Sequence, residues 1–136
     1  MITVVVGIII ESGNILLCQR KKTSRYGLKW EFPGGKSEPD EPLETCLRRE
    51  LQEELAIDAQ VGELFFRQEY EYADSGNFNV FYYFVPSYTG AIQNRVFETT
   101  EWVPMRRLME YDLLEGNIEI ARKLSSLPDE AKSVPK

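Results

Sequence analysis

Leucine recurs at every fourth position from Leu43 to Leu55, within a segment whose other residues are mostly polar or charged. At about 100° per residue, this spacing places the leucines in one stripe along an α-helix, and a folded domain buries such a stripe against its core. Asp40, Glu41 and Pro42 precede the stripe, and acidic residues followed by proline are typical of a helix start. Residues 42–55 are therefore predicted to form a helix with one buried side.

Apolar and β-branched segments on both sides of this helix predict strands that pair into a sheet. A proline at position 104 and an apolar stripe near the C-terminus predict two further short helices. Strands interrupted by a few helices indicate the α+β class. The expected strands cover residues 3–10 and 15–20 as a hairpin, 30–32, 60–72 and 78–85 as a second hairpin, and 97–103, with helices from residue 104 and over 117–124.

Length and composition limit the class of protein. We expect residues 1–136 to form one domain, with a flexible tail from about residue 128. Cys18 and Cys46 lie among apolar residues and are expected to be core residues rather than a disulfide framework. The apolar N-terminal segment lacks the basic region of a secretory leader, and no segment approaches the ~20 apolar residues that cross a bilayer. We therefore expect a cytoplasmic protein without a membrane partner.

The sequence contains no histidine and carries a net charge of −6. Without imidazole, Ser-His-Asp triads, Cys-His pairs and His-ligated zinc sites are excluded. The acidic balance argues against a nucleic-acid polymer as partner, because binding to its phosphate backbone requires an excess of basic residues. A small polyanionic substrate is still compatible, since a bound cation and local Arg or Lys residues can reverse the sign of the charge at a site.

Three glutamates, Glu50, Glu53 and Glu54, fall within about one turn of the predicted helix. Residues three and four apart share a helix face, and Glu54 falls within the leucine stripe, where its carboxylate is partly desolvated. A solvated acidic face neutralised by Arg48 and Arg49 is the simpler alternative, but it does not explain a glutamate on the buried side. Converging carboxylates suit a hard divalent cation, and we expect Mg²⁺, with Mn²⁺ able to replace it.

A tight glycine turn is expected at Gly34 and Gly35, between the strand at residues 30–32 and the helix. Glycine lets a ligand approach the backbone closely, so this turn is a candidate source of a carbonyl ligand beside the glutamates. An ordinary turn would explain two glycines equally well.

The residues that surround these glutamates follow one longer pattern, G-x5-E-x7-R-E-U-x-E-E-x-G-U, in which U is a bulky aliphatic residue. They are Gly35, Glu41, Arg49, Glu50, Leu51, Glu53, Glu54 and Ile57. The pattern resembles the signature of the Nudix hydrolases, and residues 30–36 and 101–104 resemble the MutT-like branch of that family. One position departs: Ala56 stands where the family has glycine, and it carries a cost if a positive φ is required there.

The resemblance implies a mixed β-sheet sandwiched between helices and Mg²⁺-dependent hydrolysis of a nucleoside diphosphate linked to a further group. It implies metal ligation by Glu53, Glu54 and the Gly34 carbonyl, and it makes Glu50 a metal ligand or the general base. Arg49 would orient the carboxylates through its planar guanidinium group.

Further members of the site are also implied. Glu41 and Lys36 would hold the carboxylates and Arg49 in position without binding the metal themselves. An acid after the signature would add a metal ligand, for which Glu98 is the candidate and Glu101 the reserve. An ordinary surface glutamate explains Glu98 equally well.

Substrate contacts are expected from five residues outside the signature. Arg20 resembles a phosphate-contacting arginine, in a basic loop that solvation alone also explains. Phe32, Tyr72 and also Tyr83 are candidates to stack on a nucleobase, with core packing as the equal alternative. Asn117 resembles the asparagine with which MutT-like enzymes read 8-oxoguanine, although an N-cap role at the start of the last helix is favoured.

The expected activity is that of a nucleoside triphosphate pyrophosphohydrolase, which releases nucleoside monophosphate and pyrophosphate from an oxidised purine or a pyrimidine triphosphate. The alternatives are a nucleotide-sugar or ADP-ribose pyrophosphatase, and a Nudix module that binds nucleotide without cleaving it. Three intact glutamates disfavour the second alternative. The expected partner is a small nucleotide, and the protein is expected to be a monomer or homodimer.

Overall fold

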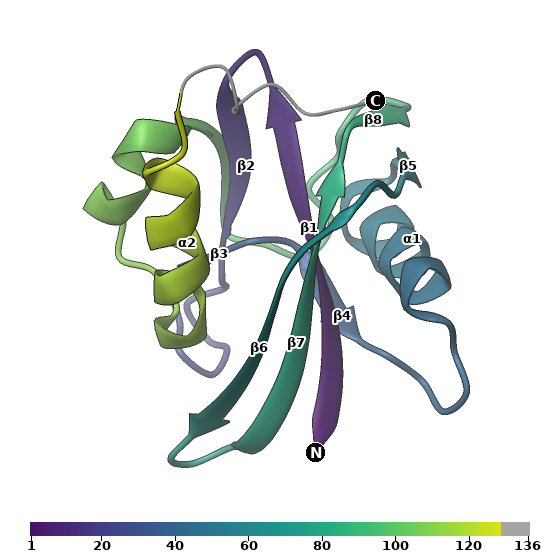
Figure 1. Ribbon diagram of the computed structural model, residues 1–136, viewed down its shortest axis with the longest axis vertical. Coiled ribbons are helices and arrows are strands. Elements are labelled where there is room, and N and C mark those ends of the chain that lie inside the picture. Colours follow the sequence, from purple (N-terminus) through teal and green to yellow (C-terminus); the bar gives the residue numbers. More distant parts are fainter. Residues whose placement is uncertain (129–136) are drawn as a thin grey trace.

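A mixed β-sheet lies at the centre of the molecule, with helix α1 against one face and helix α2 against the other (Figure 1). The computed structural model describes residues 1–128. The sheet contains β1 (Ile2–Glu11), β2 (Asn14–Gln19), β3 (Trp30–Glu31), β4 (Gly34–Lys36), β6 (Leu64–Tyr72), β7 (Gly76–Val85) and β9 (Thr99–Pro104). Strands β5 (Asp58–Gln60) and β8 (Ser87–Thr89) pair separately, and the helices are α1 (Leu43–Leu55), α2 (Ile118–Ser125) and the 3-10 helices η1 (Met105–Glu110) and η2 (Glu115–Asn117).

This arrangement confirms the expected α+β class and the sandwich of a mixed sheet between helices. The expected flexible tail lies, apart from Pro128 itself, outside the described residues. None of the helices within residues 1–128 is long and apolar enough to cross a membrane.

Strand β1 is the centre of the sheet. It pairs in parallel with β7 along one edge, and on its other edge it pairs antiparallel first with β4 and then, at its end, with β2. The predicted hairpin of β1 and β2 is confirmed, and β2 extends the sheet to β3 and β9. The pairing with β4 sets Gly34 beside Val6 and Gly35 beside Val5.

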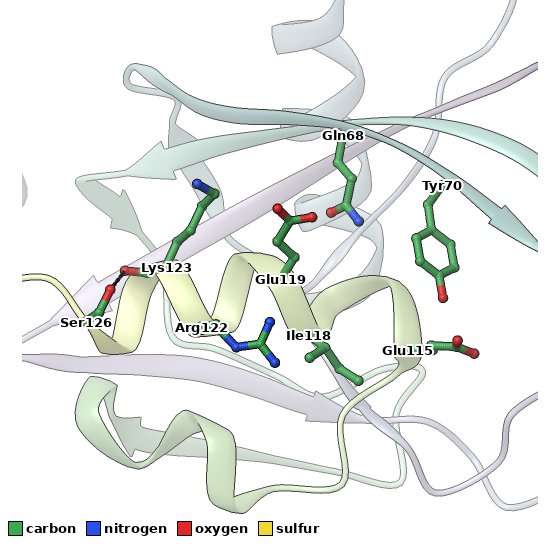
Figure 2. A pocket seen from close by; sticks show the side chains of 8 residues that line it. All are labelled: Gln68, Tyr70, Glu115, Ile118, Glu119, Arg122, Lys123 and Ser126. Carbon is green, nitrogen blue, oxygen red and sulfur yellow. Dashed lines mark hydrogen bonds between the residues drawn. The ribbon is translucent and has the colours of Figure 1, made fainter.

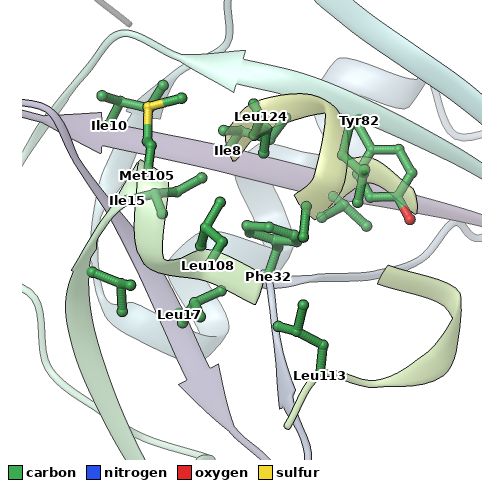
Figure 3. Close-up of a cluster of buried hydrophobic side chains, with 14 residues drawn as sticks. Ile8, Ile10, Ile15, Leu17, Phe32, Tyr82, Met105, Leu108, Leu113 and Leu124 are labelled. Carbon is green, nitrogen blue, oxygen red and sulfur yellow. The ribbon is translucent and has the colours of Figure 1, made fainter. Parts of the chain in front are cut away.

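The two faces of β1 bury separate cores, because successive side chains of a strand point to opposite faces. Val5 and Ile9 pack in the cluster that contains Leu47 and Leu51 of α1. On the other face, Ile8 and its even-numbered neighbours pack in the cluster covered by α2 and η1 (Figure 3). Cys18 and Cys46 are buried and free, as expected of core residues.

Helix α1 confirms the predicted leucine stripe, since Leu47, Leu51 and Leu55 are fully buried. Pro42 is the N-cap rather than the first helical residue. The helix ends at Ala56, whose backbone is left-handed (φ 62°, ψ 30°). A positive φ is therefore required where alanine replaces the glycine of the family pattern, and a Cβ in that conformation costs about 1 kcal/mol.

One strand prediction and one turn prediction were wrong. Residues 60–72 do not form one strand: β5 pairs with β8, and the pairing of β6 with β7 shifts register near Leu64. Between β5 and β6 the Gly62 N–H still donates to the Phe84 carbonyl (2.7 Å), so the chain stays beside β7, and the bulge follows between Leu64 and Phe66. Gly34 and Gly35 are not a turn but part of β4, and the short strand β8 was not predicted.

Candidate active site

A cavity of about 570 Å³ opens between β1, β4, the β6–β7 hairpin and the loop that follows β2. Acidic, basic, amide and aromatic side chains all line it. Of the predicted site residues, Arg20, Phe32, Gly34, Lys36, Glu54, Tyr72 and Asn117 line this cavity. The fold therefore brings together residues that are far apart in the sequence.

Arg49 bridges three of the predicted glutamates. Its Nε and Nη2 donate to the two carboxylate oxygens of Glu41 (2.8 and 2.9 Å), a bidentate pairing. Its Nη1 donates to Glu50 (3.0 Å) and to Glu53 (3.4 Å). Nη2 also donates to the Lys36 carbonyl (3.3 Å), so Lys36 meets Arg49 through its backbone. A single guanidinium group thus fixes the spacing of three carboxylates.

Glu54 turns toward β4 and away from Arg49. The Gly7 N–H donates to the Pro33 carbonyl (2.8 Å), and hydrogen-bonded pairs alternate along an antiparallel ladder. The next pair, Val6 and Gly34, is therefore not bonded within the ladder, and Gly34 points both its N–H and its carbonyl away from β1. The Gly34 N–H accordingly donates to Glu54 Oε1 (3.3 Å).

Burial and charge repulsion both act on the glutamates of α1. Burial, followed by the negative charges of Glu50 and Glu31, raises the pKa of Glu54 to about 8. Burial also raises the pKa of Glu50, against the lowering effect of Arg49. The exposed fractions of the Glu50 and Glu53 side chains are 15% and 58%, so Glu50 is largely enclosed whereas Glu53 reaches solvent.

These carboxylates suit a divalent cation. Across residues 1–128, no three acidic or thiol side chains are already arranged around one ion position. Glu50 and Glu53 instead form ion pairs with Arg49. Glu54, however, is a half-buried carboxylate that faces other carboxylates and has only a backbone N–H as donor. Carboxylate oxygens that no neighbouring positive charge neutralises are the ligands that Mg²⁺ or Mn²⁺ binds in proteins.

Arg20 lies in the cavity and is held from two sides. Its Nη1 donates to the Glu31 carboxylate (3.1 Å), and its Nε donates to the Arg25 carbonyl (2.8 Å). Burial raises the pKa of Glu31, which the neighbouring Arg20 partly offsets. Glu31 lines the cavity but was not among the predicted site residues.

The side chain of Asn117 does not cap α2, so the favoured N-cap interpretation was wrong. Asn117 occupies the N-cap position, but no side-chain capping hydrogen bond is formed there. Instead its Oδ1 accepts from the Phe32 N–H (3.1 Å), and its Nδ2 donates to the Tyr82 hydroxyl (3.4 Å). With 7% of its surface exposed, Asn117 is a buried amide fixed in orientation at the cavity wall.

The aromatic residues divide between the cavity and the core. Phe32 lines the cavity and also packs in the core beneath it, and Tyr72 lines the cavity with its hydroxyl accepting from the Gly116 N–H (2.8 Å). Tyr83 does not line the cavity but packs in the cluster against α1, so its core alternative holds. Its neighbour Tyr82, which was not predicted, lines the cavity because adjacent strand residues face opposite sides.

Glu98 and Glu101 lie outside the residues that line the cavity. Glu98 follows a loop that packs on the end of α1, where the Arg95 N–H donates to the Glu54 carbonyl (3.0 Å). The Glu98 carboxylate accepts from the Lys22 N–H (3.4 Å) and is exposed. Glu98 is thus near the start of the basic loop, on the segment attached to the glutamate end of α1.

A second groove, of about 560 Å³, runs between β6 and α2 (Figure 2). Figure 2 shows Gln68 of β6 facing Glu119 of α2 across it, and Tyr70 of β6 facing Glu115. Arg122 and Lys123 add positive charge, and Glu115 adds negative charge. Because no predicted metal or substrate residue lines this groove, the first cavity is the candidate active site.

Comparison with known proteins shows similarity over nearly the whole chain. The NUDIX domain family model matches residues 1–124. A CTP pyrophosphohydrolase of Escherichia coli (strain K12) is 37% identical over 128 residues, which cover 93% of this chain and 93% of that protein. An 8-oxo-dGTP diphosphatase of the same strain is 33% identical over 125 residues, which cover 91% of this chain and 96% of that protein.

A solved structure has the same fold. The solution structure of the E. coli ORF135 protein superposes with a TM-score of 0.85 and 34% sequence identity, covering 96% of this chain and 93% of that chain. The similarity therefore extends over the strands and helices that surround the cavity as well as over the signature at residues 35–57.

Proposed function

The chain belongs to the Nudix family, with MutT-like relatives, and on that premise we propose that it hydrolyses nucleoside triphosphates to nucleoside monophosphate and pyrophosphate. The observation that carries this proposal is that Glu54, Arg20 and Asn117 line one cavity. Carboxylates for a cation, a guanidinium group for phosphate and an oriented amide for a base are the three contacts that a nucleotide requires. The names of the relatives favour an oxidised purine or a pyrimidine triphosphate.

We propose that Glu50, Glu53, Glu54 and the Gly34 carbonyl hold Mg²⁺, or Mn²⁺ in its place, with Glu98 as a further ligand. When bound, the cation would neutralise phosphate oxygens and lower the pKa of a coordinated water. The Gly34 carbonyl points away from β1, on the same edge of β4 as the N–H that donates to Glu54, which supports its inclusion.

Residues of this chain orient the glutamates and provide a general base. Arg49, held by both oxygens of Glu41, sets the positions of Glu50 and Glu53. Glu50 is the candidate to accept a proton from the attacking water, because its carboxylate is largely enclosed and its raised pKa brings it closer to neutral pH. Arg20 would contact the phosphates, with Tyr72 and Asn117 at the nucleoside.

We also propose a cytoplasmic setting and a protein that acts alone or as a homodimer. The two buried thiols, Cys18 and Cys46, support a reducing compartment. The net charge of −6 supports a small nucleotide rather than a nucleic-acid polymer as the partner.

A substrate panel tests the proposal. Purified protein with Mg²⁺ or Mn²⁺ is assayed against the dNTPs, 8-oxo-dGTP, CTP and ADP-ribose, and pyrophosphate is measured separately from phosphate. The expected result is pyrophosphate release from one of the triphosphates. Preference for ADP-ribose would favour the alternative pyrophosphatase, and nucleotide binding without turnover would favour the non-catalytic module.

Two variants on the same helix separate the glutamate role from general effects of charge. Glu53→Gln removes a proposed ligand, whereas Glu44→Gln removes an exposed carboxylate from the first turn of α1. The first is expected to abolish turnover and keep the fold, and the second to keep turnover. Full Mg²⁺-dependent activity in Glu53→Gln would overturn the metal assignment.

A further inference from the structure

Two loops that are distant in the sequence are joined at the mouth of the cavity. The Tyr26 hydroxyl, in the loop after β2, donates to the Asp74 carboxylate in the turn between β6 and β7. The same hydroxyl lies 3.1 Å from Ser75 Oγ. The Arg25 Nη1 donates to Ser75 Oγ (2.7 Å), which makes a second contact between the loops. We call these contacts of Arg25 and Tyr26 with Asp74 and Ser75 the clasp.

The clasp joins the cations of the cavity to the sheet. Arg25 lines the cavity, and its carbonyl accepts from Arg20 Nε (2.8 Å), so the same residue positions both guanidinium groups. The Tyr26 ring packs on Tyr72 with ring centroids 5.3 Å apart, and the Tyr72 hydroxyl is held by the Gly116 N–H. The loop therefore rests on a residue that is itself anchored at the cavity wall.

The loop depends on these contacts for its shape. Tyr26 and Leu28 both have left-handed backbones, with φ values of 56° and 67°. Non-glycine residues hold this conformation only when surrounding contacts impose it. The hydrogen bond from Tyr26 lowers the pKa of Asp74, so Asp74 accepts that bond as a carboxylate.

We propose that Tyr26 is a positioning residue whose bond to Asp74 holds Arg20 and Arg25 at the cavity to receive the polyphosphate group of a nucleotide. The identity of the substrate in this inference rests on the proposed function, whereas the contacts of the clasp do not depend on it. Arg20, Arg25 and Lys36 are the cations that line the cavity, against the acids Glu31 and Glu54, and a polyanion would be drawn to them.

A double-mutant cycle tests the clasp. Tyr26→Phe keeps the ring on Tyr72 and removes the hydroxyl, and Asp74→Asn removes the carboxylate charge. Tyr88→Phe is the matched control, because Tyr88 packs on the α1 side of the sheet, away from the cavity. For the preferred triphosphate, we expect each clasp variant to raise KM by about three- to tenfold, which is the range that one hydrogen bond contributes.

The expected kcat stays within about twofold of the parent, because the glutamates are untouched. The KM of the double variant is expected to be no higher than that of the single variant with the higher KM, because both substitutions remove the same hydrogen bond. A KM equal to that of the parent, additive effects in the double variant, or a loss confined to kcat would overturn the proposal.

Two measurements without turnover distinguish failure of the clasp from failure of the proposed function. Binding of inorganic tripolyphosphate, followed by calorimetry, is expected to weaken by the same factor in Tyr26→Phe. Tryptic cleavage after Lys21, Lys22, Arg25 or Lys29 is expected to become faster, because the loop is released. If the parent hydrolyses no nucleotide and both changes occur, the clasp stands without the proposed function; if neither occurs, the clasp is overturned even in an active enzyme.

Discussion

The Glu50 carboxylate lies directly against the backbone of Gly35. A Cβ at position 35 would be 2.3 Å from the Glu50 carboxylate carbon and 2.4 and 2.6 Å from its oxygens. Gly35 has no positive φ, so its backbone would accept any residue and only the carboxylate excludes one. Glycine is therefore required at position 35 because a side chain there would overlap the Glu50 carboxylate.

Gly35→Ala is accordingly expected to lower kcat by about 100-fold or more while the protein still folds, because a displaced catalytic carboxylate is costly. Its free energy of unfolding is expected to fall by about 1–3 kcal/mol. Steady-state kinetics and urea unfolding measure the two effects. Glu50→Asp draws the carboxylate back by one methylene group, so the double variant is expected to lose less activity than the two single losses combined. A fully active Gly35→Ala would contradict this account.

Ala56→Gly is expected to stabilise the protein by about 0.5–1 kcal/mol, because Ala56 ends α1 in a left-handed backbone that glycine adopts without steric cost. Urea unfolding checks the difference. Ala59→Gly is the contrasting control: Ala59 is buried in β5, where glycine is expected to destabilise. A loss of stability in Ala56→Gly would mean that another contact of the alanine methyl outweighs its backbone cost.

Asn117→Ala is expected to lower the free energy of unfolding by about 1–3 kcal/mol, because it leaves the buried Phe32 N–H without an acceptor. It is also expected to reduce the discrimination among bases across the triphosphate panel. Tyr82→Phe removes the partner of Asn117 Nδ2 but keeps the bond to Phe32, so its selectivity is expected to change less. Equal selectivity in Asn117→Ala and the parent would remove Asn117 from base recognition.

Glu41→Gln is expected to destabilise the protein at neutral pH and to lose this effect in acid. The bonds from Arg49 and from the Glu38 N–H lower the pKa of Glu41 from 4.5 to about 2. A lowered carboxyl pKa contributes stability above pH 4.5, and the contribution is lost as the pH falls toward 2. Unfolding of parent and variant at several pH values in that window is expected to show their stabilities converge. A constant difference would contradict the assignment.

Much of the fold follows from local patterns. The leucine stripe of α1 and the hairpin of β1 and β2 were predicted from spacing alone, because amphipathic periodicity reports which side is buried. β4 was missed because two glycines are typical of a turn. Residues distant in the sequence require glycine at these two positions. A Cβ added at Gly34 would clash with the Val5 carbonyl, and a Cβ added at Gly35 would clash with the Glu50 carboxylate.

The candidate site was predicted where side chains carry recognisable chemistry and missed where only the fold decides. Arg20, Glu54 and Asn117 line the cavity, and the side chain of Asn117 bonds to Phe32 rather than capping α2. Tyr82 and Tyr83 are chemically identical neighbours, so composition cannot say which one faces the cavity. The pairing of β7 with β1 and β6 makes that choice.

The opposite orientations of Tyr82 and Tyr83 constrain how such a chain can change in length. Inserting or deleting one residue within β7 would exchange the side chains on one side of the change between the cavity and the layer beneath α1, for example by putting Tyr83 where Tyr82 holds Asn117. The turn before β7 and the loop after β2 are constrained in length as well, because the clasp between Tyr26 and Asp74 joins them. Natural or engineered variants that alter cavity size are therefore expected to do so by substitution along β7.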